Sequence, residues 1–428
     1  MTRYKKTAVA LVNVALIACV VFGLELYYRV KYPCDRADDR VTWTFIPGIG
    51  DGYRPNDTVR LSSRFDYCVE QRTNSLGFLD HEPPQWDEIK DKLRIAIIGD
   101  SMIEATQVPI ADKVQTVLRQ SLATDLGLDA SVVAWGISGF GQVQELALFE
   151  RFGLPLHPDI VLLIVVPNDL KNNSWLVQSI DDGVSPDTPY NVEIRPASLT
   201  DPRNVKDWVT IQPVPIPEIV HLPAPPETAP PDPIRPWLLK NSVLYQYLLH
   251  LAIANFRTVS NFLAPSGSDF EVLGYYIDQL RQKNPELAPL LENWPQNDRK
   301  EYVSAWNAFE YKSASLAFDL TIRATEHVMD QWAELAKREK FKLVAMMKAD
   351  FTGLDGQIAI WERVLRERGI PIISQIDYYK ARGISRHDEH FLRDGHWNAQ
   401  GHRWTAESFV EFLRAHPDWL TSAKVARF

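Results

Sequence analysis

The stretch Arg94-Ile95-Ala96-Ile97-Ile98-Gly99-Asp100-Ser101 decides the fold of this 428-residue chain. Its isoleucine-rich run predicts a buried strand, and the glycine that follows predicts a sharp turn. Ser101 then lies at the carboxyl end of a strand, which is where open α/β sheets place their chemistry. Because Gly-Asp-Ser alone is a common turn sequence, a functional role for the serine depends on the rest of the chain.

From residue 93 onward, apolar strands alternate with helical patterns. This alternation predicts an α/β fold in which helices cover both faces of a parallel sheet. The predicted strands are 94–98, 131–135, 159–166, 341–347 and 370–375. The predicted helices lie at about 112–126, 141–152, 315–339, 357–368 and 399–414.

The alternation is interrupted by an insertion at about 176–312. Fourteen of the 29 prolines fall between residues 186 and 236, and proline at this density cannot sustain a helix or a central strand. We expect a partly ordered, extended surface segment that serves as a lid or a partner-binding arm, with a structureless linker as the alternative. An amphipathic helix is expected over 238–262, resting either on the core or on a membrane face.

The N-terminus carries a candidate membrane anchor. Basic residues in segment 1–7 precede an apolar stretch that begins the expected span 8–28, and Tyr27 and Tyr28 end it. These flanks suit a cytoplasmic N-terminus and an aromatic belt. We expect a single-pass signal-anchor that places the remaining chain in the periplasm or at the cell exterior of a bacterium. A cleaved signal peptide and a lipoprotein attached through Cys19 are the alternatives.

The remaining features bound the protein's class. Residues 29–92 form a polar, β-rich lead-in to the main domain 93–428. Cys34 and Cys68 either pair in an oxidising compartment or stay as thiols. The net charge of −9 argues against a nucleic-acid partner. No cysteine and histidine cluster has zinc-site spacing, and neither a metal nor an organic cofactor is expected.

A nucleophile, a base and an acid can be assigned from the sequence. A serine nucleophile needs a base within hydrogen-bond reach and a group that orients this base. Ser101 is the candidate nucleophile, and Asp394-Gly395-His396-Trp397-Asn398 supplies the other two. His396 would be the general base and Asp394 its orienting acid, with Asp388 as the alternative acid. The other histidines nearby are expected to be exposed and structural: His387, His390 and His402.

Two further strand ends supply candidate oxyanion donors. Gly136-Ile137-Ser138-Gly139 follows the second strand, and a glycine there lets a backbone N–H approach a substrate closely. Val166-Pro167-Asn168-Asp169 follows the third strand and offers a side-chain amide. We therefore assign the oxyanion site to the backbone N–H groups of Ser101 and Gly139 and to the amide of Asn168.

A serine, a glycine and an asparagine after successive strands, followed by a C-terminal Asp/His pair, resemble the SGNH (GDSL-like) hydrolase superfamily. The resemblance covers about 93–175 and 340–415. It implies a flavodoxin-like three-layer α/β/α sandwich and an acyl-serine intermediate. It also implies the roles of nucleophile, oxyanion donors and base for Ser101, Gly139, Asn168 and His396.

Three positions depart from the usual motifs of this superfamily. In the first block, Met102 follows Ser101 in place of the usual leucine. Val166 replaces the usual glycine of the third block, and Asp394 precedes His396 by two residues instead of three. The resulting Asp-x-His-Trp arrangement is similar to that of the SGNH-like proteins of alginate O-acetylation. This similarity implies O-acetyl chemistry on a glycan.

We therefore expect a membrane-anchored, extracytoplasmic serine esterase that removes a small acyl group, such as acetyl, from a carbohydrate. An O-acyltransferase acting on a cell-envelope glycan would use the same residues, because only the acceptor of the acyl group differs. A non-catalytic glycan-binding protein with the same fold is the third hypothesis, which the altered spacing of the acid motivates.

Overall fold

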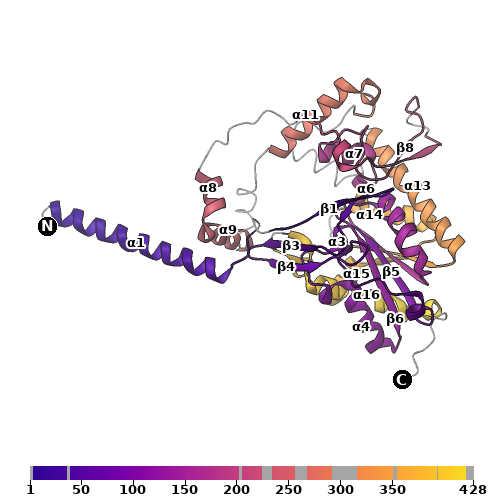
Figure 1. Ribbon diagram of the computed structural model, residues 1–428, viewed down its shortest axis with the longest axis horizontal. Coiled ribbons are helices and arrows are strands. Elements are labelled where there is room, and N and C mark those ends of the chain that lie inside the picture. Colours follow the sequence, from indigo (N-terminus) through magenta and orange to yellow (C-terminus); the bar gives the residue numbers. More distant parts are fainter. Residues whose placement is uncertain are drawn as a thin grey trace. The chain divides into compact units, whose positions relative to one another are not determined.

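The computed structural model describes eight segments, and its chain divides into two compact units (Figure 1). The described residues are 3–35, 39–201, 205–223, 234–255, 268–291, 316–349, 354–392 and 394–420. Unit 1 comprises Met1–Asp39, Leu61–Cys68 and Pro226–Ser266. Unit 2 comprises Arg40–Arg60, Val69–Pro225 and Gly267–Phe428.

A five-stranded parallel sheet forms the centre of unit 2. Its strands are β5 (Leu93–Gly99), β6 (Ala130–Gly136), β7 (Ile160–Val165), β10 (Lys342–Met347) and β11 (Ile372–Ser374). They pair in the order β11-β10-β7-β5-β6, and every pairing is parallel. Counted along the chain, this is the order 2-1-3-4-5 of the flavodoxin-like doubly wound sheet. The five predicted strands and the predicted parallel sheet are confirmed.

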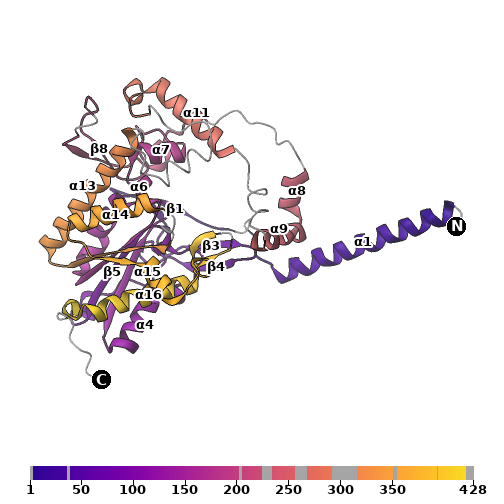
Figure 2. The ribbon, with the colours of Figure 1, turned by 180° about the vertical axis from the view of Figure 1, so that it is seen from behind.

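Helices cover both faces of this sheet (Figures 1 and 2). One face carries α5 (Gln142–Leu148), α13 (Leu316–Glu339) and α14 (Asp355–Glu367). The opposite face carries α4 (Val114–Leu126) and α16 (Ala399–Ala415). Neighbouring residues of β5 point to opposite faces of the sheet. Ile98 packs with the first set of helices and Ile97 with the second. Both faces are thus buried, which explains why the strands are mainly apolar.

The five predicted helices agree with the structure, except that the last residues of one of them are not α-helical. Four of them begin and end within two residues of α4, α13, α14 and α16. The helix predicted over 141–152 is α5 up to Leu148, and Phe149–Gly153 continues it as a π-helix. The apolar periodicity of 3.6 residues does not distinguish an α-helix from a short wider turn, so the sequence pattern did not show this change.

The segment that precedes the sheet packs into unit 2. β1 (Trp43–Ile46) and β2 (Gly50–Tyr53) form an antiparallel hairpin, and β3 (Thr58–Ser63) pairs with β4 (Tyr67–Arg72). Ile46, Ile49 and Phe78 are buried in the same core as α5 and α13. Residues 40–60 and 69–92 therefore help to build the unit that carries the sheet, with a short helix α2 (Trp86–Ile89) before β5.

The insertion contains a short hairpin and separate helices. β8 (Glu193–Pro196) and β9 (Trp208–Ile211) pair in antiparallel fashion, after α6 (Asp169–Asn172) and α7 (Trp175–Asp182). The later helix α11 (Ser268–Lys283) packs with α7 around a small apolar core. Residues 202–204, 224–233, 256–267 and 292–315 of the predicted insertion lie outside the described residues.

Unit 1 contains the N-terminal helix α1 (Arg3–Lys31) and the pair α8 (Ile234–Asn241) and α9 (Val243–Asn255). Within α1, Leu11–Lys31 is long and apolar enough to cross a membrane, as judged by length and composition. The helix predicted over 238–262 is in fact α8 and α9, and its last residues lie outside the described part of the chain.

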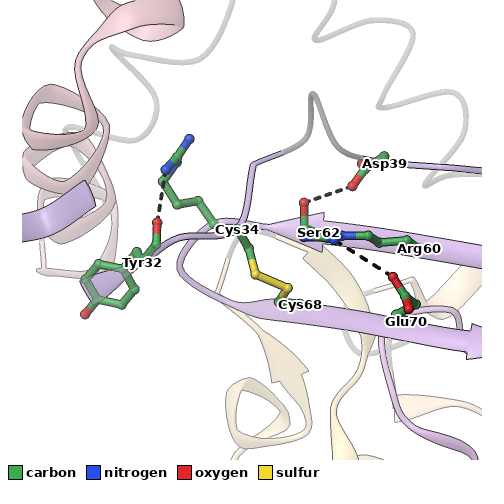
Figure 3. Close-up of a disulfide and its surroundings, with 8 residues drawn as sticks. Tyr32, Cys34, Asp39, Arg60, Ser62, Cys68 and Glu70 are labelled. Carbon is green, nitrogen blue, oxygen red and sulfur yellow. Dashed lines mark hydrogen bonds and ion pairs between the residues drawn. A yellow bond between two sulfur atoms is a disulfide. The ribbon is translucent and has the colours of Figure 1, made fainter. Parts of the chain in front are cut away.

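The cysteines after α1 form a disulfide in unit 1. Cys34 and Cys68 are bonded with their Cα atoms 6.1 Å apart, which joins the segment after α1 to the start of β4 (Figure 3). Ser62 Oγ donates a hydrogen bond of 2.8 Å to Asp39 Oδ1 beside it. Of the two alternatives that the sequence left open, the structure contains the paired form.

Candidate functional site

The strand order brings three predicted site residues to one edge of the sheet. β5 lies between β6 and β7, and Ser101, Gly139 and Asn168 follow the carboxyl ends of these three strands. The order of the strands reverses at β5 and β7, because the chain first adds β6 on one side and then β7 on the other. In doubly wound sheets, ligands bind at the carboxyl edge at such a reversal.

Asp100 links the serine segment to the asparagine segment. Ser101 begins the short helix α3 (Ser101–Glu104), and Asp100 caps it by accepting the Met102 N–H at 3.0 Å. The second carboxylate oxygen of Asp100 accepts Asn168 Nδ2–H at 3.0 Å and lies 3.4 Å from Ser101 Oγ. An amide group carries two N–H donors, so Asn168 keeps a second donor for another acceptor.

Gly139 adopts a conformation that favours glycine. Its φ angle is +79°, in the left-handed region where other residues are strained. Its carbonyl oxygen accepts hydrogen bonds from Asn172 Nδ2 and, at 3.2 Å, from Gln178 Nε2. Among the described residues, no acceptor is bonded to the N–H of Gly139. A fixed peptide with an N–H that stays unbonded is what an oxyanion donor requires.

His396 and Asp394 form a hydrogen-bonded pair on the same strand. β13 (Asp394–Trp397) pairs with β12 (His390–Phe391), and both Nδ1 and the backbone N–H of His396 meet Asp394 Oδ1, the latter at 3.0 Å. Gln107, just after α3, donates to Asp394 Oδ2 at 3.4 Å. α3 also contacts β13 directly. Ser101 and the Asp394–His396 pair therefore lie on contacting elements, although 293 residues separate Ser101 from Asp394 in the chain.

The alternative acid and the alternative histidines have other contacts. Asp388 is exposed, and the hydrogen bonds that the structure describes for it run through its backbone. His387 is exposed in the same 3-10 turn. His402 is fully buried and accepts the Val114 N–H at 3.2 Å, and burial lowers the pKa of His402 to about 3. A histidine that stays neutral in the core is structural. The expectation that His402 is exposed was wrong, because its ring on α16 is buried in the core and bonded to the start of α4.

Lys348 is a buried residue that the sequence patterns did not single out. It follows β10, and its Nζ donates to the carbonyl of Gly395 at 3.1 Å and lies 2.8 Å from His390 Nε2. The buried carboxylate of Glu389 lies 3.0 Å from the same nitrogen of His390. Gly395 lies between Asp394 and His396 in the chain. Through its bond to Gly395, Lys348 therefore holds this part of β13 against the sheet. The available signal was a lysine directly after the apolar strand 341–347.

Glu104 is a second such residue, and it connects α3 to the Gly139 turn. Its buried carboxylate accepts the Ser138 N–H at 3.2 Å and the Ser138 hydroxyl. The hydroxyl of Tyr53 is a further partner, and burial raises the pKa of Glu104. Lys113 Nζ donates to the carbonyl of Glu104 at 2.7 Å. Glu104 therefore fixes the position of Gly139 relative to Ser101.

Gly136, at the end of β6, is packed directly against α3. A Cβ at this position would lie 2.6 Å from Glu104 N and 2.7 Å from Asp100 O, which are backbone atoms. We expect Gly136→Ala to destabilise the protein by about 1–3 kcal/mol, as in other overpacked sites. Because α3 must move, we expect kcat to fall by roughly 10²-fold. Thermal unfolding and ester hydrolysis measure the two effects.

Gly127→Ala is the matched control for this prediction. Gly127 caps α4 at a positive φ, and nothing lies within 4 Å of a Cβ built there. Its replacement is expected to cost about 1 kcal/mol through backbone strain alone and to leave kcat unchanged. A Gly136→Ala variant with the kcat of the wild-type protein would contradict the close packing of α3 against β6.

Two buried carboxyl groups, Asp169 and Glu145, share one amide partner. Gln142 Nε2 donates to Asp169 at 2.7 Å and to Glu145 at 3.5 Å. Asp169 also accepts the Val166 N–H at 2.9 Å, which braces the turn that carries Asn168. Burial raises the pKa of both carboxyl groups well above the usual range, and the negative charge of Asp100 adds to this. Burial therefore favours the protonated form of both carboxyl groups relative to exposed ones.

We expect Glu145→Gln to stabilise the protein selectively at alkaline pH. A carboxyl group whose pKa is raised on folding contributes stability below its unfolded pKa of about 4, and this is lost as pH rises through the folded pKa. Glutamine keeps the shape and removes the ionisation. Thermal unfolding near pH 5 and pH 9 should show the larger gain in Tm at pH 9, about 2–4 °C for each kcal/mol recovered.

The exposed Glu150 provides the control for the pH experiment. Glu150→Gln alters the same type of side chain five residues further along the chain, where the side chain is exposed. It should change Tm by equal small amounts at both pH values. A gain for Glu145→Gln that is the same near pH 5 and near pH 9 would show that Glu145 does not titrate between them.

Comparisons with known proteins find matches among solved structures only. No protein-family model matches the chain, and no curated protein matches it. Among solved structures, the chain is similar to an acetyl xylan esterase, AlAXEase, with 10% identity and a TM-score of 0.33 over 75% of this chain and 99% of that chain. The chain is also similar to TesA, with 9% identity and a TM-score of 0.33 over 75% of this chain and 98% of that chain. It is similar as well to a lipase/acylhydrolase from Enterococcus faecalis, with 12% identity and a TM-score of 0.32 over 76% of this chain and 96% of that chain.

Proposed function

We propose that this protein is an extracytoplasmic serine esterase of the SGNH type. One observation carries the proposal. The helix that begins at Ser101 contacts the strand on which Nδ1 of His396 is bonded to Asp394. A nucleophile at the carboxyl end of a strand, next to an oriented imidazole, is the arrangement that acyl transfer requires.

The proposed reaction follows from this arrangement. With Nδ1 of His396 bonded to Asp394, Nε2 is the nitrogen that takes the proton of Ser101 as Oγ attacks the ester carbonyl carbon. The new O–C bond makes a tetrahedral oxyanion, which accepts hydrogen bonds from the N–H groups of Ser101 and Gly139 and from the amide of Asn168. His396 then gives the proton to the leaving alcohol as the ester C–O bond breaks. Water attacks the acyl-serine in the same way and releases the acid.

Two features support the proposed location and substrate. The helix α1 can cross a membrane, and the Cys34–Cys68 disulfide suits an oxidising compartment outside the cytoplasm. We propose an acetyl or similarly small acyl group on a carbohydrate as the substrate, because the Asp-x-His-Trp sequence resembles that of alginate O-acetylation proteins. The same acyl-serine could instead pass its acyl group to a glycan hydroxyl.

Labelling with a fluorophosphonate probe tests the proposal. The full chain in detergent should react with the probe at Ser101, and the Ser101→Ala variant should not. The natural reaction is then assigned by incubating the protein with an acetylated glycan and with a second, unacetylated glycan. Free acetate as the product indicates a hydrolase, and acetylated second glycan indicates a transferase. A folded protein without labelling would instead favour the non-catalytic, glycan-binding alternative.

A further inference from the structure

Helices α1, α8 and α9 of unit 1 carry exposed large apolar side chains. α1 exposes them along Leu11–Lys31, as a membrane-spanning helix does. α9 contacts both α1 and α8. α8 exposes Trp237 (62%), and α9 exposes Leu248 (54%) and Leu251 (38%). Large apolar patches on neighbouring elements mark sites where a protein meets a partner or a membrane.

α9 is attached to α1 at a carboxylate inside the apolar helix. Glu25 accepts the N–H groups of Val243 and Leu244 and the hydroxyl of Ser242, each at 2.9 Å. Arg29 adds an ion pair of 2.8 Å. A carboxylate in a spanning helix is costly unless it has partners, and the first N–H groups of a helix need acceptors. The Glu25 carboxylate and the first N–H groups of α9 therefore provide each other with hydrogen-bond partners. This contact fixes the level along α1 at which α9 begins.

The contact between Glu25 and α9 lies near the C-terminal end of the candidate membrane-spanning segment Leu11–Lys31. Glu25 precedes Lys31 by six residues, which is about 9 Å along the helix axis. On the same turns of α1, Tyr28 stacks on Tyr247 of α9 with ring centroids 4.1 Å apart. Tyrosine, lysine and arginine gather where a membrane meets water. The start of α9 therefore lies at the depth of the membrane–water interface if α1 crosses the bilayer.

One face of α9 packs against the rest of unit 1, and another face is exposed. Val243 and Leu249 are buried. Leu244, Leu248 and Leu251 follow the spacing i, i+4, i+7, which aligns them on one side of a helix. Leu244 is half-buried, and the two later leucines are exposed. An apolar stripe on a helix that begins at interfacial depth is suited to a lipid surface.

We propose that α8 and α9 lie in the interfacial layer of the membrane that α1 crosses, with Trp237, Leu248 and Leu251 among the acyl chains of the lipids. This inference rests on the membrane anchor of the proposed function. Interfacial helices insert their apolar side by about 5–10 Å, which matches the level of Glu25 on α1. Unit 1 thus contacts the bilayer through two elements, a spanning helix and a hairpin that lies along the surface.

Depth-dependent fluorescence quenching tests this inference on the full chain. The free thiol is removed by Cys19→Ser, and single cysteines are introduced by Leu248→Cys, Trp237→Cys or Leu16→Cys and labelled with bimane. Val209→Cys, an exposed position on β9 of unit 2, is the control. The proteins are placed in phosphatidylcholine vesicles that carry a nitroxide either near the headgroup or in the middle of the acyl chain.

The expected result has a distinct pattern for each position. The labels at 248 and 237 should lose most of their fluorescence to the shallow nitroxide, and the label at 16 to the deep one. The label at 209 should be unaffected. Adding Glu25→Ala should reduce shallow quenching at 248 without changing the label at 16, because α9 loses its attachment to α1. Glu70→Ala, which removes an exposed carboxylate of β4, should change neither label.

Two outcomes would overturn the inference, and they are distinguishable. Quenching at position 16 without quenching at 248 and 237 leaves the anchor in place and excludes the interfacial hairpin. A label at 248 that is shielded only as protein concentration rises, independently of nitroxide lipid, would assign the apolar face to a second copy of the chain. Absence of quenching at position 16 would reject the anchor and the hairpin together, and fluorophosphonate labelling of the same samples would show separately whether the serine chemistry stands.

Discussion

Replacing Ser101 by alanine is expected to lower kcat/KM for p-nitrophenyl acetate by about 10⁴–10⁶-fold, close to the background rate. Alanine removes the oxygen that forms the acyl-enzyme, and the hydroxyl of Ser138, which follows β6, is bonded to Glu104. His396→Ala should cause a loss of similar size, because the hydroxyl of serine is a weak nucleophile without a base. Since the two residues act as a unit, the double variant should be no slower than either single variant.

His387→Ala is the matched control for His396→Ala. His387 is an exposed histidine nine residues earlier in the chain, and its replacement should leave kcat/KM unchanged. Circular dichroism and thermal unfolding would show that all variants are folded. If Ser101→Ala and His396→Ala both keep the wild-type rate in a preparation that hydrolyses the ester, the activity arises from another site and the proposed assignment is wrong.

Asp394→Asn is expected to lower kcat by roughly 10⁴-fold with little change in stability. Oδ1 of Asp394 meets both Nδ1 and the backbone N–H of His396, so this carboxylate orients the ring and stabilises the imidazolium that forms during attack. An asparagine can turn its N–H₂ group toward Nδ1 and then stabilises the wrong tautomer. Steady-state hydrolysis of p-nitrophenyl acetate measures the loss in kcat.

Asp388→Asn makes the comparison decisive for the identity of the acid. Both variants remove one negative charge from the same segment, but Asp388 is exposed and the hydrogen bonds described for it involve its backbone. We expect it to retain the wild-type kcat. A loss in Asp388→Asn with full activity in Asp394→Asn would instead assign the role of the acid to Asp388.

Local patterns were sufficient for the elements of the sheet. All five strands of the central sheet were predicted, because strands buried on both faces are continuous apolar runs. That Ser101, Gly139 and Asn168 share an edge also follows from the chain, since parallel strands have their carboxyl ends at the same edge. Glu104 and Lys348 were not found, because a single charged residue near an apolar run has no periodicity that indicates its partners.

The sequence by itself determined the five strands of the central sheet, most of the helices that cover it, and which residues of the required chemical types follow the strands. Only the tertiary structure decided that β5 lies between β6 and β7, that Asp394 rather than Asp388 contacts His396, and that α9 attaches to Glu25. The reason is physical. Helix and strand formation depends on neighbours within a few residues, whereas Gln107 and Asp394 meet across a sequence separation of 287. Such contacts form only when the packing of the whole sheet and its helices brings distant segments together.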